Sequence, residues 1–370
     1  MKRSHEIVKW GVKWIWQIVA LLLFACTLFP EFVKLAYTKM IFKWGGIGLR
    51  IITGAIPFAI GEYLYLFLLI LLIYNIILSL YKLKNQFKLP IFTSNTGYLI
   101  SKKLSVLFVI FELIWGLNYQ QSSPAKEFDL QVPKSYSERQ MDSMSLSLIN
   151  QLNYTRSIIS DSQLMEVKVD SLIKQTLKHY GAISQQYPFL SYLQPNIKWA
   201  QLPKLGDYVG YLAFYHPITG EAIVRADLPT LTQPFTISHE IAHQLGYASE
   251  TEANFIAYVV AINSNDPLFE YAMQLQLFTY SQEAQLFMIA KTGDFKKWEA
   301  VVKRNKALLS PKVLTDRQLI RDFFRSRQNQ RLPGSEKLYD QFLIWNKQAS
   351  GINSYNDVLL WALAYQKKSA

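Results

Sequence analysis

Cysteine is almost absent from this 370-residue chain, which contains one, Cys26, inside an apolar run. A single cysteine excludes both a disulfide framework within the chain and a zinc site made of cysteine ligands. Charged residues are also scarce, at 18% of the chain, and histidine occurs only five times. Half of the residues are hydrophobic and the mean hydropathy is +0.07. This composition excludes a disordered chain and indicates that part of it lies in lipid.

Acidic residues are rarest in the first third of the chain, where the basic excess is concentrated. The formal net charge is +12, and residues 1–120 contain 13 Lys and Arg against 4 Asp and Glu, a balance of +9. The remaining 250 residues contain 26 Lys and Arg against 23 Asp and Glu, a balance of +3. Positive charge beside apolar runs orients membrane segments, whereas a protein that binds nucleic acid concentrates it on a soluble face. We therefore expect a lipid bilayer as partner and no nucleic acid.

Three apolar runs predict a membrane domain over residues 1–120, with transmembrane helices at about 14–30, 63–81 and 104–119. The second run has no charge between Glu62 and Lys82 and is long enough to cross the hydrocarbon. The first run follows a basic leader, and a cleaved signal peptide is its competing interpretation. The third run contains Glu112, to which we assign no catalytic role.

Basic residues between the spans predict the orientation of the chain. With three spans, the leader and the loop between the second and third spans share a side, and they contain nine Lys and Arg together. The loop between the first two spans contains four. Because basic segments stay in the cytoplasm, we expect a cytoplasmic N-terminus and an extracytoplasmic C-terminal domain.

The rest of the chain predicts a linker over residues 121–136 and a mainly helical domain over residues 137–370. The linker is expected because this stretch is polar, contains two prolines and has no periodicity. Residues 197–227 change from helical spacing to short strands, with a hairpin between the last two. Helices with breaks near Gly293, Ser310, Pro333 and Gly351 follow the strands.

A metal-binding motif lies in the segment FTISHEIAHQLG, which is helical in pattern and ends at Gly246. His239, Glu240 and His243 form the pattern His-Glu-x-x-His. Residues four apart share one face of a helix, so both imidazoles can bind one Zn²⁺ while Glu240 acts as general base on a water molecule. A polar patch on an amphipathic helix is the alternative, but it fits poorly because Ile237, Ile241 and Leu245 surround the histidines.

A catalytic zinc ion usually takes a third protein ligand, and carboxylates follow the motif closely. Ser249 stands where a metzincin would have its third histidine, and Glu250 and Glu252 come directly after it. Ser249 and Glu252 also form a predicted capping box for the next helix.

The pattern Glu-x-x-x-Asn at Glu250 and Asn254 resembles that of gluzincin metallopeptidases. The resemblance implies that Glu250 is the third zinc ligand and that Asn254 supports a ligand histidine. Glu252 remains the alternative third ligand. One departure is that Glu250 follows His243 by seven residues, a shorter link than gluzincins usually have.

Nearly the whole chain resembles an uncharacterised bacterial family of membrane proteins, a domain of unknown function with three N-terminal spans followed by an HExxH domain. The matching stretches are TGAIPFAIGEYLY, HPITGEAIV, PFTISHEIAHQLGYASETEANFIAY and GINSYNDVLL. The resemblance implies the bacterial inner membrane as location. It also implies the fold class: an α-helical membrane segment plus a mainly helical α+β zincin-like domain with a small sheet.

These expectations combine into a membrane-anchored zinc metallopeptidase that hydrolyses protein or peptide substrates near the membrane. In zincins, a strand before the motif helix presents an edge to substrate, and the residues from Ala222 to Arg225 could do so or could form an ordinary interior strand. Tyr247, Tyr258, Tyr280 and His216 are candidate oxyanion donors. The alternative function is a catalytically silent zinc-binding membrane receptor or scaffold.

Overall fold

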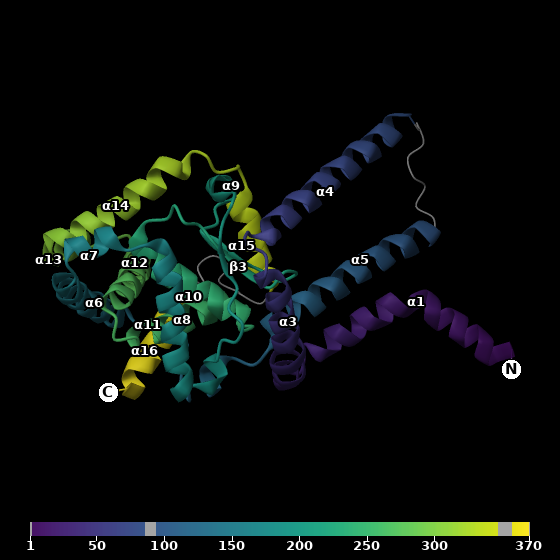
Figure 1. Ribbon diagram of the computed structural model, residues 1–370, viewed down its shortest axis with the longest axis horizontal. Helices are drawn as coiled ribbons and strands as arrows, with labels where there is room; N and C mark the ends of the chain where they lie inside the picture. The colour runs from purple at the N-terminus through teal and green to yellow at the C-terminus, as the bar shows by residue number, and fades with distance from the viewer. Residues whose placement is uncertain (1, 86–93, 347–356, 370) are drawn as a thin grey trace.

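The computed structural model describes residues 2–85, 94–346 and 357–369 of the chain. Lys88 in the predicted second loop and the predicted break near Gly351 lie outside the described residues. The N-terminal helices are α1 (Lys2–Cys26), α2 (Pro30–Phe32), η1 (Val33–Phe42), α3 (Lys43–Gly54), α4 (Ile60–Asn85) and α5 (Ser94–Ile114). Figure 1 shows that α1, α4 and α5 extend away from a rounded body formed by the rest of the chain.

The body is mainly helical, as the sequence predicts. After the turns η2 (Gly116–Gln120) and η3 (Pro124–Lys126) come α6 (Glu138–Ile158), α7 (Asp161–Glu166), α8 (Val169–Gln186), η4 (Pro188–Leu190) and α9 (Pro203–Val209). The central helices are α10 (Gln233–Gln244), preceded by η5 (Thr230–Thr232), and α11 (Glu250–Ile262). The C-terminal helices are α12 (Pro267–Thr292), α13 (Phe295–Leu308), α14 (Pro311–Gln328), α15 (Ser335–Trp345) and α16 (Val358–Ser369).

Within the described residues the strands form one small sheet, at the place in the sequence where strands are expected. Its strands are β1 (Ile197–Trp199), β2 (Ala213–His216) and β3 (Glu221–Val224), in the order β1-β3-β2. β2 and β3 form the predicted hairpin and pair antiparallel, with Tyr215 opposite Ala222, while β1 pairs parallel with β3. β3 is therefore the interior strand, and all four of its residues are buried.

The core of the body lies between α10 and the helices around it. Helical spacing in residues 137–180 predicts the buried face of α6, and Met141, Leu148 and Leu152 are at most 2% exposed. α11 is deeply enclosed, and its residues Phe255, Ile256 and Val259 have no exposed surface. Burial of such side chains is the main favourable contribution to folding.

One helix in the described part of the chain is long and apolar enough by itself to cross a membrane, and it is the second predicted span. It covers Ile60–Tyr81 in α4, and none of its residues after Glu62 is buried. The first predicted span differs: α1 ends at Cys26, and residues Lys13–Cys26 and Pro30–Gly54 meet at an angle of 101°. The third also ends earlier than expected, because α5 stops at Ile114 and Gly116–Gln120 forms a separate turn.

Buried polar groups connect the start of α4 to the sheet. The Glu221 carboxylate of β3 accepts hydrogen bonds from the backbone N–H groups of Ile60 and Gly61, at 3.2 and 2.7 Å. Lys198 Nζ of β1 donates to Glu221 Oε1 at 2.7 Å and to the carbonyl oxygen of Thr53 at 2.8 Å. An anion at a helix N-terminus and a cation at a helix C-terminus are both favourable. α4 and α3 are thus attached directly to the strands.

Residues 121–136, the predicted linker, pack on the body. Phe128 and Leu130 are 1% and 7% exposed and belong to the main core cluster. The ring of Phe128 lies edge-on to those of Phe189 and Phe255. The stretch looks polar in sequence because its few apolar side chains have no regular spacing, and only the tertiary packing reveals their role.

Candidate metal centre

Helix α10 carries the His-Glu-x-x-His motif at the centre of the body. Pro234 lies in its first turn, where a missing N–H leaves no helical bond broken. After its last turn, Gly246 has φ of +97°, a left-handed conformation that glycine adopts without strain. His239 and His243, one turn apart, have ring centroids separated by 4.6 Å. The helix therefore presents both imidazoles on the same side.

Helix α11 supplies the predicted carboxylate and amide. Glu250 is its first residue and Asn254 lies one turn later, so both side chains can face α10. Ser249 occupies the position before the helix, but its side chain makes no capping hydrogen bond, so the predicted capping box with Glu252 is wrong. The carboxylate of Glu252 interacts instead with the charges of Lys34 and Glu127.

Three predicted ligands come together in the structure, namely His239, His243 and Glu250. Their possible ligand atoms all lie within 4.8 Å of one another. The Oε2 atom of Glu250 is 3.2 Å from Nε2 of His239 and 3.9 Å from Nε2 of His243. Zinc bonds of about 2.1 Å in a tetrahedron place neighbouring ligand atoms roughly 3.4 Å apart, so these separations fit a zinc ion.

Hydrogen bonds orient both imidazoles toward that shared point. His243 Nδ1 lies 2.7 Å from the carbonyl oxygen of Tyr247, which can only accept, so this nitrogen carries the proton. His239 Nδ1 donates to Oδ1 of Asn254 at 2.8 Å. Each Nε2 then faces Glu250 and would offer its lone pair to a metal ion once it carries no proton. Metal-binding histidines are typically held in this way, so the residues present fit a divalent metal ion.

Glu240 lies beside the cluster and is 4% exposed. The backbone N–H of Tyr215, on the edge strand β2, donates a hydrogen bond to its carboxylate. Its Oε2 atom accepts no hydrogen bond from the described residues. Burial raises the pKa of Glu240 to about 8, although the charge of His239 acts in the opposite direction. A buried carboxylate oxygen without a partner is costly, and a water molecule held at the cluster would satisfy it.

The two candidate carboxylates have opposite pKa shifts. Burial alone would raise the pKa of Glu250, but the hydrogen bond from His239 and the charges of both histidines outweigh it and lower the pKa to about 2. Burial raises the pKa of Glu252 to about 8, with partial compensation from Lys34. Glu250 is thus held as a carboxylate at the cluster, and Glu252 lies in another environment.

Comparison with known proteins identifies the family of the chain. Residues 37–363 match the family model described as "Protein of unknown function (DUF3810)". The chain belongs to this family. No curated protein and no solved structure matches the chain. The family description assigns no activity, so the function of this DUF3810 protein has to be argued from its own residues.

Two further side chains contact the cluster, and no sequence motif marks either of them. Tyr339 of α15 donates a hydrogen bond from its hydroxyl to Oε1 of Glu250 at 2.8 Å. Trp115, between α5 and η2, lies edge-on to His243 with ring centroids 5.9 Å apart. Tyr339 follows Glu250 by 89 residues. Contacts of this kind depend on long-range packing and have no local pattern.

The four predicted oxyanion donors lie in different places. The hydroxyl of Tyr247 is 3.5 Å from Glu127, and that of Tyr258 accepts from Gln366. His216 is packed against Gly61 and the ring of Tyr65. Burial raises the pKa of Tyr280, and the charge of Glu250 contributes to the same shift. Of the four candidates, Tyr280 is thus the one whose hydroxyl interacts with Glu250 and Asn254.

The strand before the motif helix does not present a free edge. The residues Ala222 to Val224 belong to β3, which has partners on both sides, so the interior-strand alternative is correct and the substrate-edge interpretation is wrong for this segment. β2 is the edge strand beside α10, and its Tyr215 contacts Glu240. A peptide that adds to this sheet would have to pair with β2.

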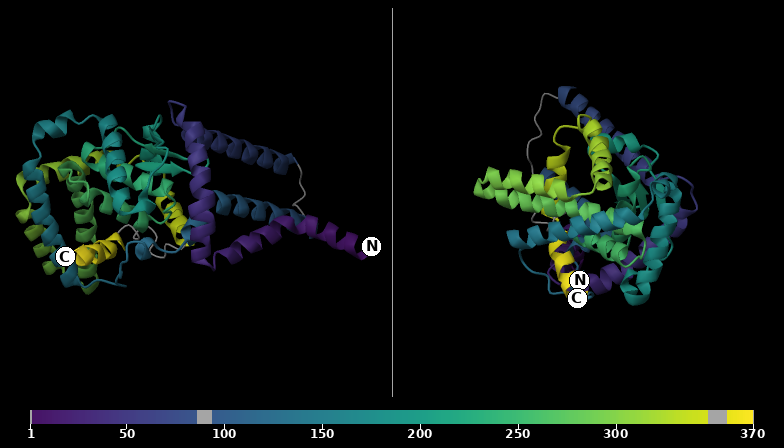
Figure 2. Two further views of the ribbon diagram at one scale, coloured as in Figure 1. Left: turned by 60° about the horizontal axis from the view of Figure 1, so that its bottom comes forward. Right: turned by 90° about the vertical axis from the view of Figure 1, so that its left-hand side faces the viewer.

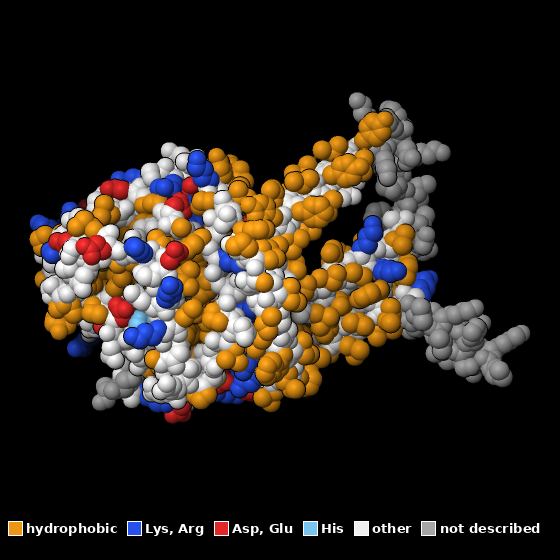
Figure 3. Space-filling model, viewed as in Figure 1, with side chains coloured by type: hydrophobic (Ala, Val, Ile, Leu, Met, Phe, Trp, Pro, Cys, Tyr) orange, Lys and Arg blue, Asp and Glu red, His pale blue; other side chains and the backbone are white. Residues whose placement is uncertain are grey.

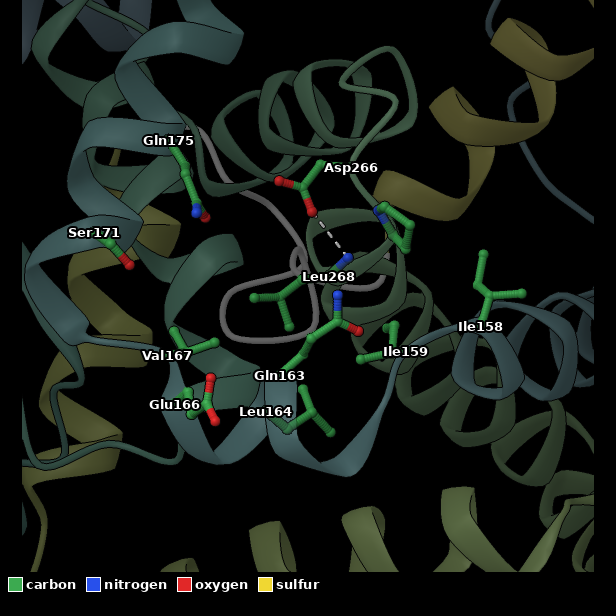
Figure 4. Close-up of a pocket in the computed structure, with 11 residues that line it drawn as sticks. Ile158, Ile159, Gln163, Leu164, Glu166, Val167, Ser171, Gln175, Asp266 and Leu268 are labelled. Atoms are coloured by element: carbon green, nitrogen blue, oxygen red, sulfur yellow. Dashed lines mark hydrogen bonds between the residues drawn. The ribbon is translucent and has the colours of Figure 1, made fainter.

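A surface cavity of about 370 Å³ lies away from the cluster (Figure 4). α7, α8 and the start of α12 line it, and Gln163, Gln175 and Asp266 are among its polar residues. Asp266 Oδ1 caps the first turn of α12, and its other oxygen lies 3.3 Å from Nε2 of His179. These contacts give Asp266 a structural role, and no residue of the metal cluster lines the cavity, so we assign the cavity no part in the chemistry.

Proposed function

We propose that this protein is a membrane-anchored, zinc-dependent metallopeptidase that hydrolyses peptide bonds of protein or peptide substrates near the membrane. His239, His243 and Glu250 bind the zinc ion, Asn254 orients His239, and Glu240 is the general base. The observation that carries the proposal is the convergence of the three ligand side chains from two helices while both Nδ1 atoms are bonded to acceptors.

The proposed chemistry divides between the metal and the chain. Bound zinc supplies Lewis acidity, which polarises a carbonyl group and lowers the pKa of water. Glu240 takes a proton from the attacking water and passes it to the leaving amine. A cation next to Glu240 favours its ionised form, which opposes the effect of burial on its pKa. The rings of Phe235 and Trp115 flank the two histidines and limit the access of water to them.

Membrane anchoring through three helices is part of the proposal. Its support is the common direction of α1, α4 and α5, which extend from the same side of the body in the left view of Figure 2. α1 and α5 are joined by hydrogen bonds from Gln17 to Ser101 and from Tyr98 to the carbonyl of Lys13. With the charge distribution, this arrangement favours a cytoplasmic N-terminus and an extracytoplasmic body in a bacterial inner membrane.

A zinc-binding receptor or scaffold without catalytic activity is the second candidate, and one observation favours it. His239, His243 and Glu250 are 6% to 8% exposed, and Tyr339 lies over Glu250, so the cluster is more enclosed than an open catalytic site needs to be. A Glu at the position of the general base favours the peptidase, because a structural zinc site has no use for it.

The decisive experiment compares cleavage by the wild type and by Glu240→Gln. Full-length protein in lipid nanodiscs is incubated with a generic peptide library, and cleavage is followed by mass spectrometry. We expect Glu240→Gln to lower the rate by at least about 100-fold, the usual contribution of a general base. Zinc content should stay unchanged, and the exposed Glu299→Gln serves as the matched control.

Equal cleavage by wild type and Glu240→Gln would overturn the peptidase. Zinc that is required for folding, with no turnover in the zinc-loaded or the zinc-free state, would instead support the scaffold.

A further inference from the structure

The helical segment from α2 through η1 to α3 buries several polar side chains and exposes many large apolar ones. Its buried residues include Lys34, Thr38, Arg50 and Thr53, which are 4% to 7% exposed. Its most exposed large apolar residues, which we call the outer face, are 55% to 69% exposed. The outer face consists of Phe32, Leu35, Met40, Ile41, Trp44, Ile51 and Ile52. A surface helix of a water-soluble protein has the opposite distribution.

Each buried polar side chain in this segment has a partner in the body. Lys34 Nζ is 3.1 Å from the carboxylate of Glu127, and Thr38 donates to Oδ1 of Asn118 at 3.0 Å. The guanidinium of Arg50 donates to the backbone carbonyls of Gln194, Leu193 and Gln244. The buried polar side chains are therefore held by the body, and the large apolar side chains of the outer face would be costly to expose to water.

The orientation of the segment indicates what covers the outer face. Residues Pro30–Gly54 run at 101° to Lys13–Cys26. In the left view of Figure 2 the segment stands across the bases of α4 and α5, between these helices and the body. In Figure 3 hydrophobic side chains continue from α4 over this region to α5. Lys43 Nζ lies 6.0 Å from the ring of Trp44, and this pair of residue types is common at the membrane interface.

We propose that the outer face of residues 30–54 lies on the lipid bilayer, in the plane of the membrane interface. The occupant is lipid because the face is continuous with the exposed span of α4 and nearly perpendicular to α1. A helix in this position buries its apolar side at the boundary between headgroups and acyl chains. This inference goes beyond the proposed function, because it holds whether or not the metal cluster is catalytic.

One layer of side chains separates this lipid-facing helix from the metal cluster. The ring of Phe42 in η1 lies 5.7 Å from that of Trp115, and Trp115 lies 5.9 Å from His243. Gly246, which ends α10, lies directly against η1, because a Cβ atom there would meet Thr38 Cγ2 at 2.8 Å. The docked helix thus holds the cluster close to the membrane surface. For the proposed peptidase, the scissile bond would lie in a polypeptide segment next to the bilayer.

Spin labels on the outer face test the proposal in the full-length protein. Cys26→Ser removes the native thiol, and single cysteines are placed by Ile41→Cys, Ile52→Cys and Leu35→Cys for labelling. The protein is studied in nanodiscs of phosphatidylethanolamine and phosphatidylglycerol, where collisions with oxygen report lipid and collisions with a water-soluble nickel chelate report water. Ile70→Cys in the α4 span is the lipid control, and Met165→Cys in α7, where Met165 is 80% exposed, is the water control.

We expect the oxygen-to-nickel ratio at positions 41, 52 and 35 to exceed that of position 165 several-fold and to stay below that of position 70, which lies deeper in the bilayer. Ratios like that of position 165 would overturn the proposal. Labels shielded from both reagents, with dipolar broadening between them, would instead identify a second copy of the chain on this face and would also overturn it. Because the labelled positions are exposed and none of them belongs to the proposed metal site, the result is independent of zinc binding and of peptidase activity.

Discussion

At the scale of single residues, the candidate centre depends on the hydrogen bonds made by the side-chain atoms that do not face the metal position. His239 and His243 commit Nδ1 to Asn254 and to the Tyr247 carbonyl, which leaves Nε2 for a metal. Glu250 receives a hydrogen bond from Tyr339 on Oε1 and presents Oε2 to the histidines. These second contacts fix the orientation of the ligands before a metal binds, and such partners strengthen metal binding.

The choice between the two carboxylates can be tested by zinc affinity. Loss of a residue that only supports a ligand lowers metal affinity about 10- to 100-fold. Glu250→Gln should lower zinc affinity more than 100-fold, because it removes a charged ligand itself. Glu252→Gln, two residues along the same helix, should change the affinity little, because Glu252 interacts with Lys34 and Glu127. Competition with a fluorescent chelator measures both values. A larger loss in Glu252→Gln would assign the third ligand to Glu252.

The role of Tyr339 predicts a smaller effect on the same measurement. Tyr339→Phe should weaken zinc binding about 10- to 100-fold, because the hydroxyl that orients Glu250 is lost while the carboxylate stays. Tyr154→Phe on α6, where the side chain is 69% exposed, is the matched control. Unchanged zinc affinity in Tyr339→Phe would show that the contact does not support the metal ligand.

At the scale of elements, the centre depends on where α10 stops. Gly246 has positive φ and allows the chain to turn from α10 toward Glu250. It also lies close to η1 and to Asn118. The same residue therefore shapes both the link between α10 and α11 and the contact with η1. A helix end is usually a local feature, but here it is also a packing site.

Two glycine substitutions separate these roles of Gly246. Gly246→Ala and Gly293→Ala should each cost about 1–2 kcal/mol of stability for placing a side chain in a left-handed conformation. A Cβ atom at position 293 meets nothing within 4 Å, whereas at position 246 it meets Thr38 Cγ2 at 2.8 Å. Gly246→Ala should therefore have the lower unfolding midpoint in detergent. Equal midpoints would show that η1 can move away without cost.

At the scale of the whole molecule, the chain consists of an enclosed body and helices that extend from it, joined by buried polar contacts. Lys198, Glu221 and Arg50 link the body to α3 and α4 through backbone groups at helix ends. Buried charged groups of this kind are retained only when they are paired. Movement of α3 or α4 relative to the body would thus be transmitted directly to β3, which packs against α10.

The proposed topology predicts the outcome of reporter fusions at the C-terminus. With three spans, an alkaline phosphatase fused there should be active and a green fluorescent protein dark, because the first needs the periplasm and the second folds in the cytoplasm. Fusions after position 90, in the second loop, should give the reverse result. Fluorescence from the C-terminal fusion would place the C-terminus in the cytoplasm. It would contradict the proposed topology, because a chain with both ends in the cytoplasm has an even number of spans.

Local regularities in the sequence were sufficient for much of the fold. The apolar run of α4, the helical spacing of α6 and the short strands around the hairpin were predicted because each depends on neighbours within a few residues. The pairing of His239 with His243 follows from the helical repeat in the same way. The ends of α1 and α5 were misplaced because apolar composition continues past the point where packing on the body bends the chain.

The sequence by itself determined that an apolar helix is present and that two histidines and a glutamate share one helical turn, since hydropathy and helix periodicity are local properties. Only the tertiary structure decided that Glu250 faces these histidines while Glu252 faces Lys34, that Tyr339 supports Glu250, and that residues 30–54 turn several polar side chains inward. Such choices depend on which faces of distant elements meet, and that is set by the packing of the whole core.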